Sequence, residues 1–218
     1  MLPAHLRVLY LHGFASSPES RKARFFSERL RQHGFTVDTP DLAEGNFSQL
    51  TITGQLKVVE QALNGQSGIL IGSSLGGYLA ALYAARHAQV ERLILLAPAF
   101  RFHKLWMQRL TREQLSYWKD SGTIPVFHYG AGRELPLDYR FMDDAASYEP
   151  MPSFPQPTLI FHGTGDDVVP FESSTEFARM HDNVRLIPLP SGHELTDVLE
   201  EIWRESESFV LGPFSNSG

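Results

Sequence analysis

The stretch Gly72-Ser73-Ser74-Leu75-Gly76-Gly77 decides the fold class of this chain. An apolar run at residues 68–71 precedes it, and a run rich in alanine and leucine at residues 75–87 follows it. These flanks predict a buried strand that turns sharply into a helix. The stretch matches the pattern Gly-x-Ser-x-Gly with Ser74 at its centre, which is typical of a nucleophilic serine presented on a strand-to-helix turn.

Gly72 and Gly76 have a steric role in this interpretation. A nucleophile on such a turn occupies a strained backbone conformation, and side chains two residues before and after it would collide. Ser73 lacks glycines at these two offsets and is a poor rival to Ser74. The helix that follows the serine points free N–H groups and its positive dipole end at developing negative charge. A glycine- and serine-rich turn without catalytic chemistry is the competing interpretation.

Apolar runs and helical patterns alternate along most of the chain. Candidate strands occupy residues 7–11, 36–39, 68–71, 93–97, 158–161 and 184–189. Candidate helices occupy residues 19–33, 49–63, 75–87, 171–181 and 194–210. This alternation predicts an α/β fold with a mostly parallel sheet of about six strands and helices on both faces.

Residues 101–157 interrupt the alternation between the fourth and fifth candidate strands. This segment is much longer than an ordinary connection, is rich in aromatic residues and ends in a proline-rich stretch at residues 150–157. We expect a helical lid whose aromatic side chains line an apolar binding site. An elaborated loop with its own small core is the alternative. The chain, residues 1–218, is then a single domain with residues 101–157 as a lid or cap insertion.

The first candidate strand runs into Leu11-His12-Gly13-Phe14, at the edge of the sheet where open α/β folds bind ligands. A backbone N–H just after Gly13 could form half of an oxyanion hole, and the N–H of Leu75 could form the other half. Phe14 is the preferred donor, and Ala15 is the neighbouring possibility. A tight glycine turn is the alternative interpretation.

An acid and a base follow the fifth and sixth candidate strands. Asp166 and Asp167 lie after the fifth strand, where a carboxylate could orient a histidine. The spacing to Val169-Pro170 favours Asp166, so Asp167 is interpreted as a capping or solvated residue. His193 follows the sixth strand in Ser191-Gly192-His193-Glu194 and could act as a general base toward Ser74. The order Ser74, Asp166, His193 is the order of the catalytic residues in α/β hydrolases.

These motifs together resemble the α/β-hydrolase superfamily over essentially the whole chain, and within it small bacterial serine esterases. The resemblance implies acyl transfer to water, in which Ser74 attacks a carbonyl, His193 takes its proton and Asp166 orients His193. It implies a small-molecule ester as substrate and no metal or organic cofactor. Two departures stand out: the first antiparallel strands of larger members are missing, and the oxyanion loop is His-Gly-Phe instead of His-Gly-Gly-Gly.

Composition excludes several other classes of protein. The net charge of −6 argues against nucleic-acid binding, and the absence of cysteine removes disulfides and thiol chemistry. The nine histidines form no His-Glu-x-x-His motif, so no metal site is expected. No stretch approaches the roughly 18 apolar residues of a membrane span, and the N-terminal residues do not resemble a secretory leader, so the cytoplasm is expected.

Other functions remain open at this point. Thioesterases, aminopeptidases and carbon–carbon hydrolases use the same three residues. A non-catalytic ligand-binding module on this fold is a further alternative, because fold does not fix function. The sequence does not determine the oligomeric state.

Overall fold

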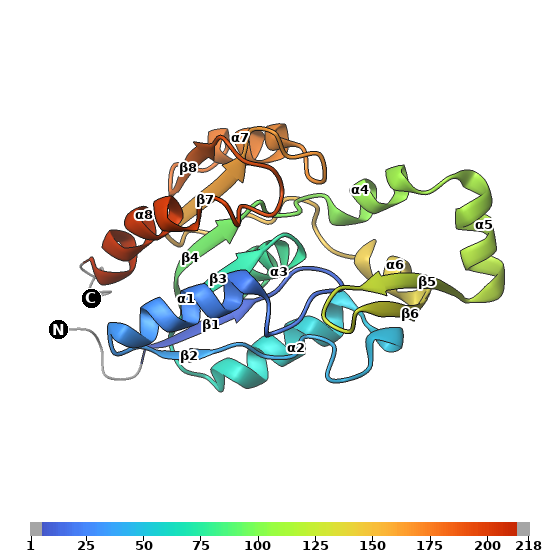
Figure 1. Cartoon of the computed structure of the whole chain (residues 1–218), viewed down its shortest axis with the longest axis horizontal. Coiled ribbons are helices and arrows are strands. Elements are labelled where there is room, and N and C mark those ends of the chain that lie inside the picture. Colours follow the sequence, from blue (N-terminus) through green and yellow to red (C-terminus); the bar gives the residue numbers. More distant parts are fainter. Residues whose placement is uncertain (1–5, 213–218) are drawn as a thin grey trace.

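A computed structural model describes residues 6–212 and has a parallel six-stranded sheet at its centre (Figure 1). Residues 1–5 and 213–218, which the predicted domain includes, lie outside the described residues, and the expectation of no leader rests partly on the first of these segments. In spatial order the strands are β2 (Thr36–Asp38), β1 (Arg7–Leu11), β3 (Gly68–Ser73), β4 (Val90–Leu96), β7 (Thr158–Gly163) and β8 (Val184–Leu189). The predicted α/β fold and strand number are confirmed.

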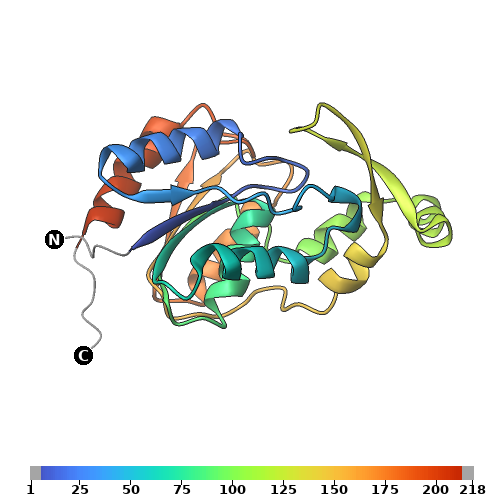
Figure 2. The ribbon, with the colours of Figure 1, turned by 90° about the horizontal axis from the view of Figure 1, so that it is seen from below.

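Helices cover both faces of the sheet (Figure 2). α1 (Arg21–Gln32) and α8 (Leu199–Leu211) pack on one face. α2 (Ile52–Leu63), α3 (Leu75–Ala84) and α7 (Phe171–Arg179) pack on the other. Because successive strand residues point to opposite faces, Tyr10 joins the α1–α8 layer while Leu9 and Leu11 join the layer of α2 and α3.

Capping side chains set the starts of two helices later than predicted. The Ser20 hydroxyl accepts the Ala23 N–H at 3.3 Å, so α1 begins at Arg21 instead of residue 19. Likewise the Thr51 hydroxyl accepts the Gly54 N–H at 2.9 Å, so α2 begins at Ile52, after the 3₁₀ turn η1 (Phe47–Gln49).

The last helix also begins later than predicted. The segment from residue 194 to 198 is a loop, and α8 starts only at Leu199. Leu195 has a φ of 55°, a left-handed conformation that interrupts any helix at this point.

The segment at residues 101–157 contains more than helices. It holds α4 (Phe102–Arg109), α5 (Arg112–Ser121), the antiparallel pair β5 (Thr123–His128) and β6 (Arg133–Asp138), and α6 (Arg140–Ala145). The predicted helical insertion therefore also contains a β-hairpin, which the sequence interpretation did not include. Pro125 and Pro136 lie opposite each other in the hairpin, which a two-stranded ribbon accommodates because alternate N–H groups point outward.

The insertion shares the core of the sheet. Trp118 of α5 is fully buried and its indole N–H donates to the Leu137 carbonyl at 2.9 Å. Trp118, Leu137 and Phe141 belong to the same apolar cluster as α2 and α3. A separate small core, the alternative that the sequence left open, is therefore not formed.

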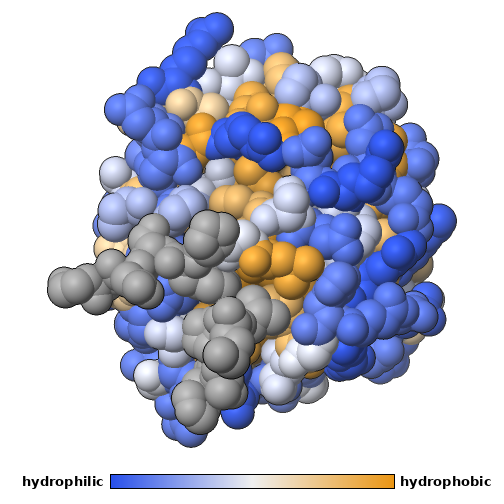
Figure 3. Space-filling model, turned by 90° about the vertical axis from the view of Figure 1, so that its left-hand side faces the viewer, coloured by the Kyte–Doolittle hydropathy of each residue, from blue (hydrophilic) through white to orange (hydrophobic). Residues whose placement is uncertain are grey.

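The end of the molecule away from the insertion, where the amino ends of the strands lie, presents mainly hydrophilic side chains around scattered apolar patches (Figure 3). None of the helices within residues 6–212 is both long enough and apolar enough to cross a bilayer.

Candidate active site

Ser74 lies on a strained turn between β3 and α3. Its φ of 53° and ψ of −117° are uncommon for a residue with a side chain. The flanking glycines are required sterically: a Cβ at Gly72 would lie 2.3 Å from the Gly76 carbonyl oxygen, and one at Gly76 would lie 2.1 Å from the Leu11 carbonyl oxygen. The turn thus holds the Ser74 hydroxyl at the carboxyl edge of the sheet.

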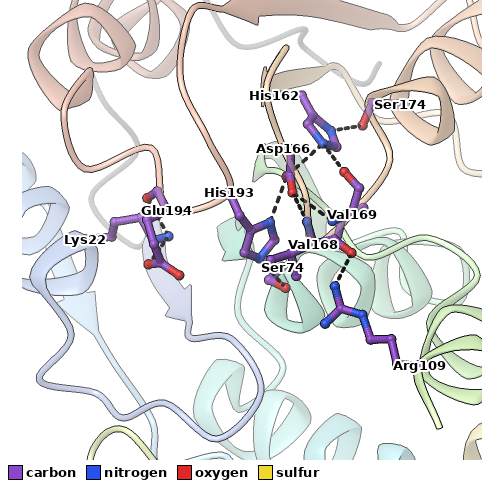
Figure 4. Close-up of polar contacts among 10 residues, drawn as sticks. All are labelled: Lys22, Ser74, Arg109, His162, Asp166, Val168, Val169, Ser174, His193 and Glu194. Atoms are coloured by element: carbon purple, nitrogen blue, oxygen red, sulfur yellow. Dashed lines mark hydrogen bonds and ion pairs between the residues drawn. The ribbon is translucent and has the colours of Figure 1, made fainter. Parts of the chain in front are cut away.

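Asp166 and His193 reach Ser74 from two neighbouring loops (Figure 4). His193 Nε2 lies 3.1 Å from Ser74 Oγ, and His193 Nδ1 lies 2.7 Å from Asp166 Oδ2. The three side chains come from the loops after β3, β7 and β8, whose parallel strands end at the same edge. Asp167 is exposed and has no hydrogen bond within residues 6–212. The structure therefore brings together the three residues that the sequence singled out.

The Asp166 carboxylate has a dense set of donors. Its Oδ1 accepts the Val168 and Val169 N–H groups at 2.8 Å each, while its Oδ2 lies 3.1 Å from His162 Nε2 in addition to His193. Burial alone would raise the pKa of Asp166, but the hydrogen bonds from His162, His193 and Val169 outweigh burial and lower it. The carboxylate is therefore ionised and fixed in orientation.

His162 was missed as a site residue by the sequence interpretation. It is fully buried on β7, and its Nε2 contacts both Asp166 Oδ2 and the Val169 carbonyl oxygen, the latter at 3.0 Å. Because both contacts are acceptors, Nε2 carries the proton, and Nδ1 then accepts the Ser174 hydroxyl at 2.7 Å. The signal was a histidine inside an otherwise apolar strand that leads into the acid loop.

Three backbone N–H groups of the Ser74 turn and the first loop lack acceptors within residues 6–212. Those of Phe14 and Leu75 make no hydrogen bond within the described part of the chain, and the same holds for Ala15, so both candidates in the first loop remain open. A Cβ at Gly13 would lie 3.5 Å from Ser74 Cβ, which places this loop directly against the serine. The loop is held by His12, whose Nδ1 lies 3.0 Å from the Gly13 carbonyl oxygen.

A cavity of about 940 Å³ opens in front of Ser74 and His193. One part of its wall is apolar and aromatic, and comes largely from the first loop and the insertion: Phe14, Phe102, Leu105, Trp106, Val126 and Phe127. Another part is polar and comes from the loop before α1, the start of α1 and the loop after β8: Ser16, Ser17, Ser20, Arg21, Lys22, Glu194 and Thr196. Within residues 6–212 no three His, Asp or Glu side chains are grouped to hold a metal ion, and the expectation of no cofactor stays a prediction.

The insertion is tied to both sides of this cavity. Arg109, at the end of α4, donates to the Val168 carbonyl of the acid loop at 2.7 Å. The Tyr129 N–H, at the tip of the β5–β6 hairpin, donates to the Ala15 carbonyl at 2.8 Å. Of the aromatic residues predicted to line a binding site, Phe102, Trp106 and those at the hairpin do so, whereas others fill the core.

Comparisons with known proteins agree with the fold. The "AB hydrolase superfamily protein YisY" of Bacillus subtilis is 26% identical, with 96% of this chain and 91% of that protein covered. "Monoacylglycerol lipase abhd6-B" of Xenopus laevis is 29% identical, with 75% of this chain and 49% of that protein covered. Among solved structures, the mouse "Alpha/beta hydrolase domain-containing protein 10" superposes with a TM-score of 0.79 at 21% identity, covering 93% of this chain and 88% of that one.

Residues 7–209 match the family described as "Uncharacterised protein family (UPF0227)". The match covers all of the sheet and all three side chains that meet at the cavity. The chain therefore belongs to the UPF0227 family and is a member of the α/β-hydrolase superfamily.

Proposed function

We propose that the chain is a serine hydrolase that cleaves carboxylic esters of apolar small molecules through an acyl-enzyme on Ser74. The observation that carries this proposal is the continuous chain of contacts from Asp166 Oδ2 through His193 to Ser74 Oγ, at 2.7 Å and 3.1 Å. With Asp166 ionised, His193 Nδ1 carries a proton and Nε2 is free to accept the serine proton.

The reaction proceeds in two halves. Ser74 Oγ bonds to the ester carbonyl carbon as its proton passes to His193 Nε2, and the oxyanion accepts hydrogen bonds from the Leu75 N–H and that of Phe14 or Ala15. The carbon–oxygen bond to the alcohol breaks, and His193 protonates the leaving alcohol. Water then attacks the acyl-enzyme, gives its proton to His193 and releases the acid, and Ser74 recovers its proton.

The cavity wall supports the proposed substrate class. Aromatic and aliphatic side chains near Ser74 favour an apolar acyl or alcohol group. The name of the Xenopus laevis relative, a monoacylglycerol lipase, supports an ester. A thioesterase or an aminopeptidase-like acyl hydrolase using the same triad is the second candidate, and a panel of esters of increasing chain length, thioesters and aminoacyl amides would rank the three classes. The insertion is proposed to act as the lid over this cavity.

The proposal is tested by labelling with a fluorophosphonate probe, followed by mapping of the modified peptide. We expect the adduct on Ser74 and not on Ser73, and Ser74→Ala should abolish both labelling and hydrolysis of short p-nitrophenyl esters with an unchanged circular dichroism spectrum. A non-catalytic binding module would stay unlabelled. Retention of most esterase activity in Ser74→Ala would show that Ser74 is not the nucleophile.

A further inference from the structure

Lys22, near the start of α1, is a buried cation beside the active site. Its exposed fraction is 8%, and lysine is rarely buried to this extent without a partner. It lies four residues before Phe26 and eight before Leu30, on the face of α1 that packs against the sheet. An apolar side chain would be expected at this position of the helix. Because burying an ammonium costs free energy, we look for the contact that stabilises it.

The Lys22 ammonium contacts the residue that follows the catalytic histidine. Its Nζ donates to the Glu194 backbone carbonyl at 2.8 Å, and the Glu194 Oε2 lies farther away, at 3.4 Å (Figure 4). The Glu194 carboxylate is mostly exposed, with a side-chain exposure of 77%. The contact with the backbone carbonyl is therefore the shorter of the two.

The backbone around His193 has little other support. Residues 193 and 194 form a turn that is only weakly hydrogen-bonded. Within residues 6–212, the bond from Lys22 is the one well-formed hydrogen bond made by a backbone N–H or C=O group of residues 192–194. The Ser191 hydroxyl donates a hydrogen bond to the Asp197 carboxylate and so joins the two ends of the loop. His193 lies between Ser191 and Glu194, the residue that Lys22 holds. Leu195, directly after Glu194, has a φ of 55°, so the loop also carries backbone strain.

We propose that Lys22 is a positioning residue that holds the backbone of the 192–194 segment, and through it keeps the His193 ring within reach of Ser74. The inference rests on the proposed serine hydrolase function. Catalytic geometry is sensitive to this kind of support, since a displacement of about 1 Å can reduce a rate by about 100-fold.

The test compares Lys22→Met with Arg29→Met, which removes another cation of α1, one paired with Glu200 of α8 and remote from the cavity. With p-nitrophenyl butyrate, a neutral ester, we expect Lys22→Met to lower kcat by about 10- to 100-fold with KM within about twofold. Its midpoint of thermal unfolding should stay close to that of wild type, because the bond lost at the Glu194 carbonyl is offset by the removal of a buried charge in favour of an apolar side chain of similar length. Arg29→Met should keep kcat within about twofold.

Hydrogen–deuterium exchange supplies a direct readout. In Lys22→Met, peptides that span residues 190–198 should exchange faster while those of the sheet do not change. Lys22→Gln, which keeps a shorter donor, should fall between wild type and Lys22→Met in kcat and serves if the methionine variant is not stable.

Three results would overturn the proposal. These are a kcat of Lys22→Met within twofold of wild type, an equal loss in Arg29→Met, or a defect confined to the KM of the carboxylate-bearing ester mono-p-nitrophenyl succinate. The last result would make Lys22 a substrate contact. If wild-type protein shows no Ser74-dependent hydrolysis, the proposed function fails by itself, and the exchange experiment still decides whether Lys22 holds the loop.

Discussion

Replacement of Asp166 by asparagine is the sharpest test of the proton path, because the surroundings dictate how the amide must sit. One carboxylate oxygen faces the Val168 and Val169 N–H groups, and the other faces His162 and His193. If the amide NH₂ turned toward the backbone, donors would face donors and two buried hydrogen bonds would be lost. We therefore expect the NH₂ to face the two imidazoles, where it opposes one N–H, that of His162 Nε2, instead of two.

This orientation inverts the tautomer of His193. Nδ1 then has to accept a hydrogen bond from the amide, so the proton moves to Nε2, the nitrogen that lies 3.1 Å from Ser74 Oγ. A protonated Nε2 cannot take the serine proton. The expected loss in kcat is about 1,000- to 10,000-fold, or about 4–5.5 kcal/mol in the activation barrier.

The matched control is Asp167→Asn, the same chemical change one residue along the loop on an exposed side chain. It should keep kcat/KM for p-nitrophenyl butyrate within about twofold, and both variants should give the circular dichroism spectrum of wild type. If Asp166→Asn kept more than a tenth of the wild-type rate, or if Asp167→Asn lost more than Asp166→Asn, the assignment of the orienting acid would be refuted.

Three further predictions concern stability. The pKa of Asp166 is lower in the folded state than its ordinary value of about 3.9, so its contribution to stability is present above that pH and is lost as pH falls. In urea titrations, wild type should therefore lose more free energy of unfolding than Asp166→Asn between pH 5 and pH 3. An equal change of the free energy of unfolding with pH in the two proteins would contradict this. His162→Phe removes a donor to Asp166, leaves the buried Ser174 hydroxyl without its acceptor and leaves the Val169 carbonyl without its donor. The free energy of unfolding should therefore fall by about 2–4 kcal/mol, and a loss below about 1 kcal/mol would argue against those contacts. Gly76→Ala places a Cβ against backbone oxygens of β1 and the loop after it and should cost about 1–3 kcal/mol together with most of the activity; a fully active, equally stable variant would contradict the packing of the turn.

The central sheet could be predicted because each strand is a short apolar run bounded by turn residues. This pattern can be recognised in the sequence alone, without knowledge of tertiary contacts. The meeting of Ser74, Asp166 and His193 followed from topology, since parallel strands end at one edge. The flanking glycines could be assigned a steric role in advance because the strained turn leaves no room for a Cβ.

What could not be predicted depends on contacts between distant segments. The β5–β6 hairpin carries the opposed prolines Pro125 and Pro136, which in sequence resemble strand breakers and are tolerated only because the ribbon has two open edges. His162 lies in an apolar strand, and only the register of β7 beside the acid loop shows that its ring meets Asp166. Lys22 lies on the first turn of α1, and its partner is 172 residues away in the chain.

The shared core of the insertion limits how a substrate can enter. Because Trp118 and Phe141 are buried with the side chains of the sheet layer, swinging the whole insertion aside would expose that core to water. The freest part is the hairpin tip, where the Tyr129 side chain is 76% exposed and its N–H makes one bond to the Ala15 carbonyl. We therefore expect substitutions at that tip to change the size of the molecules that reach Ser74, while Ser74, Asp166 and His193 stay in place.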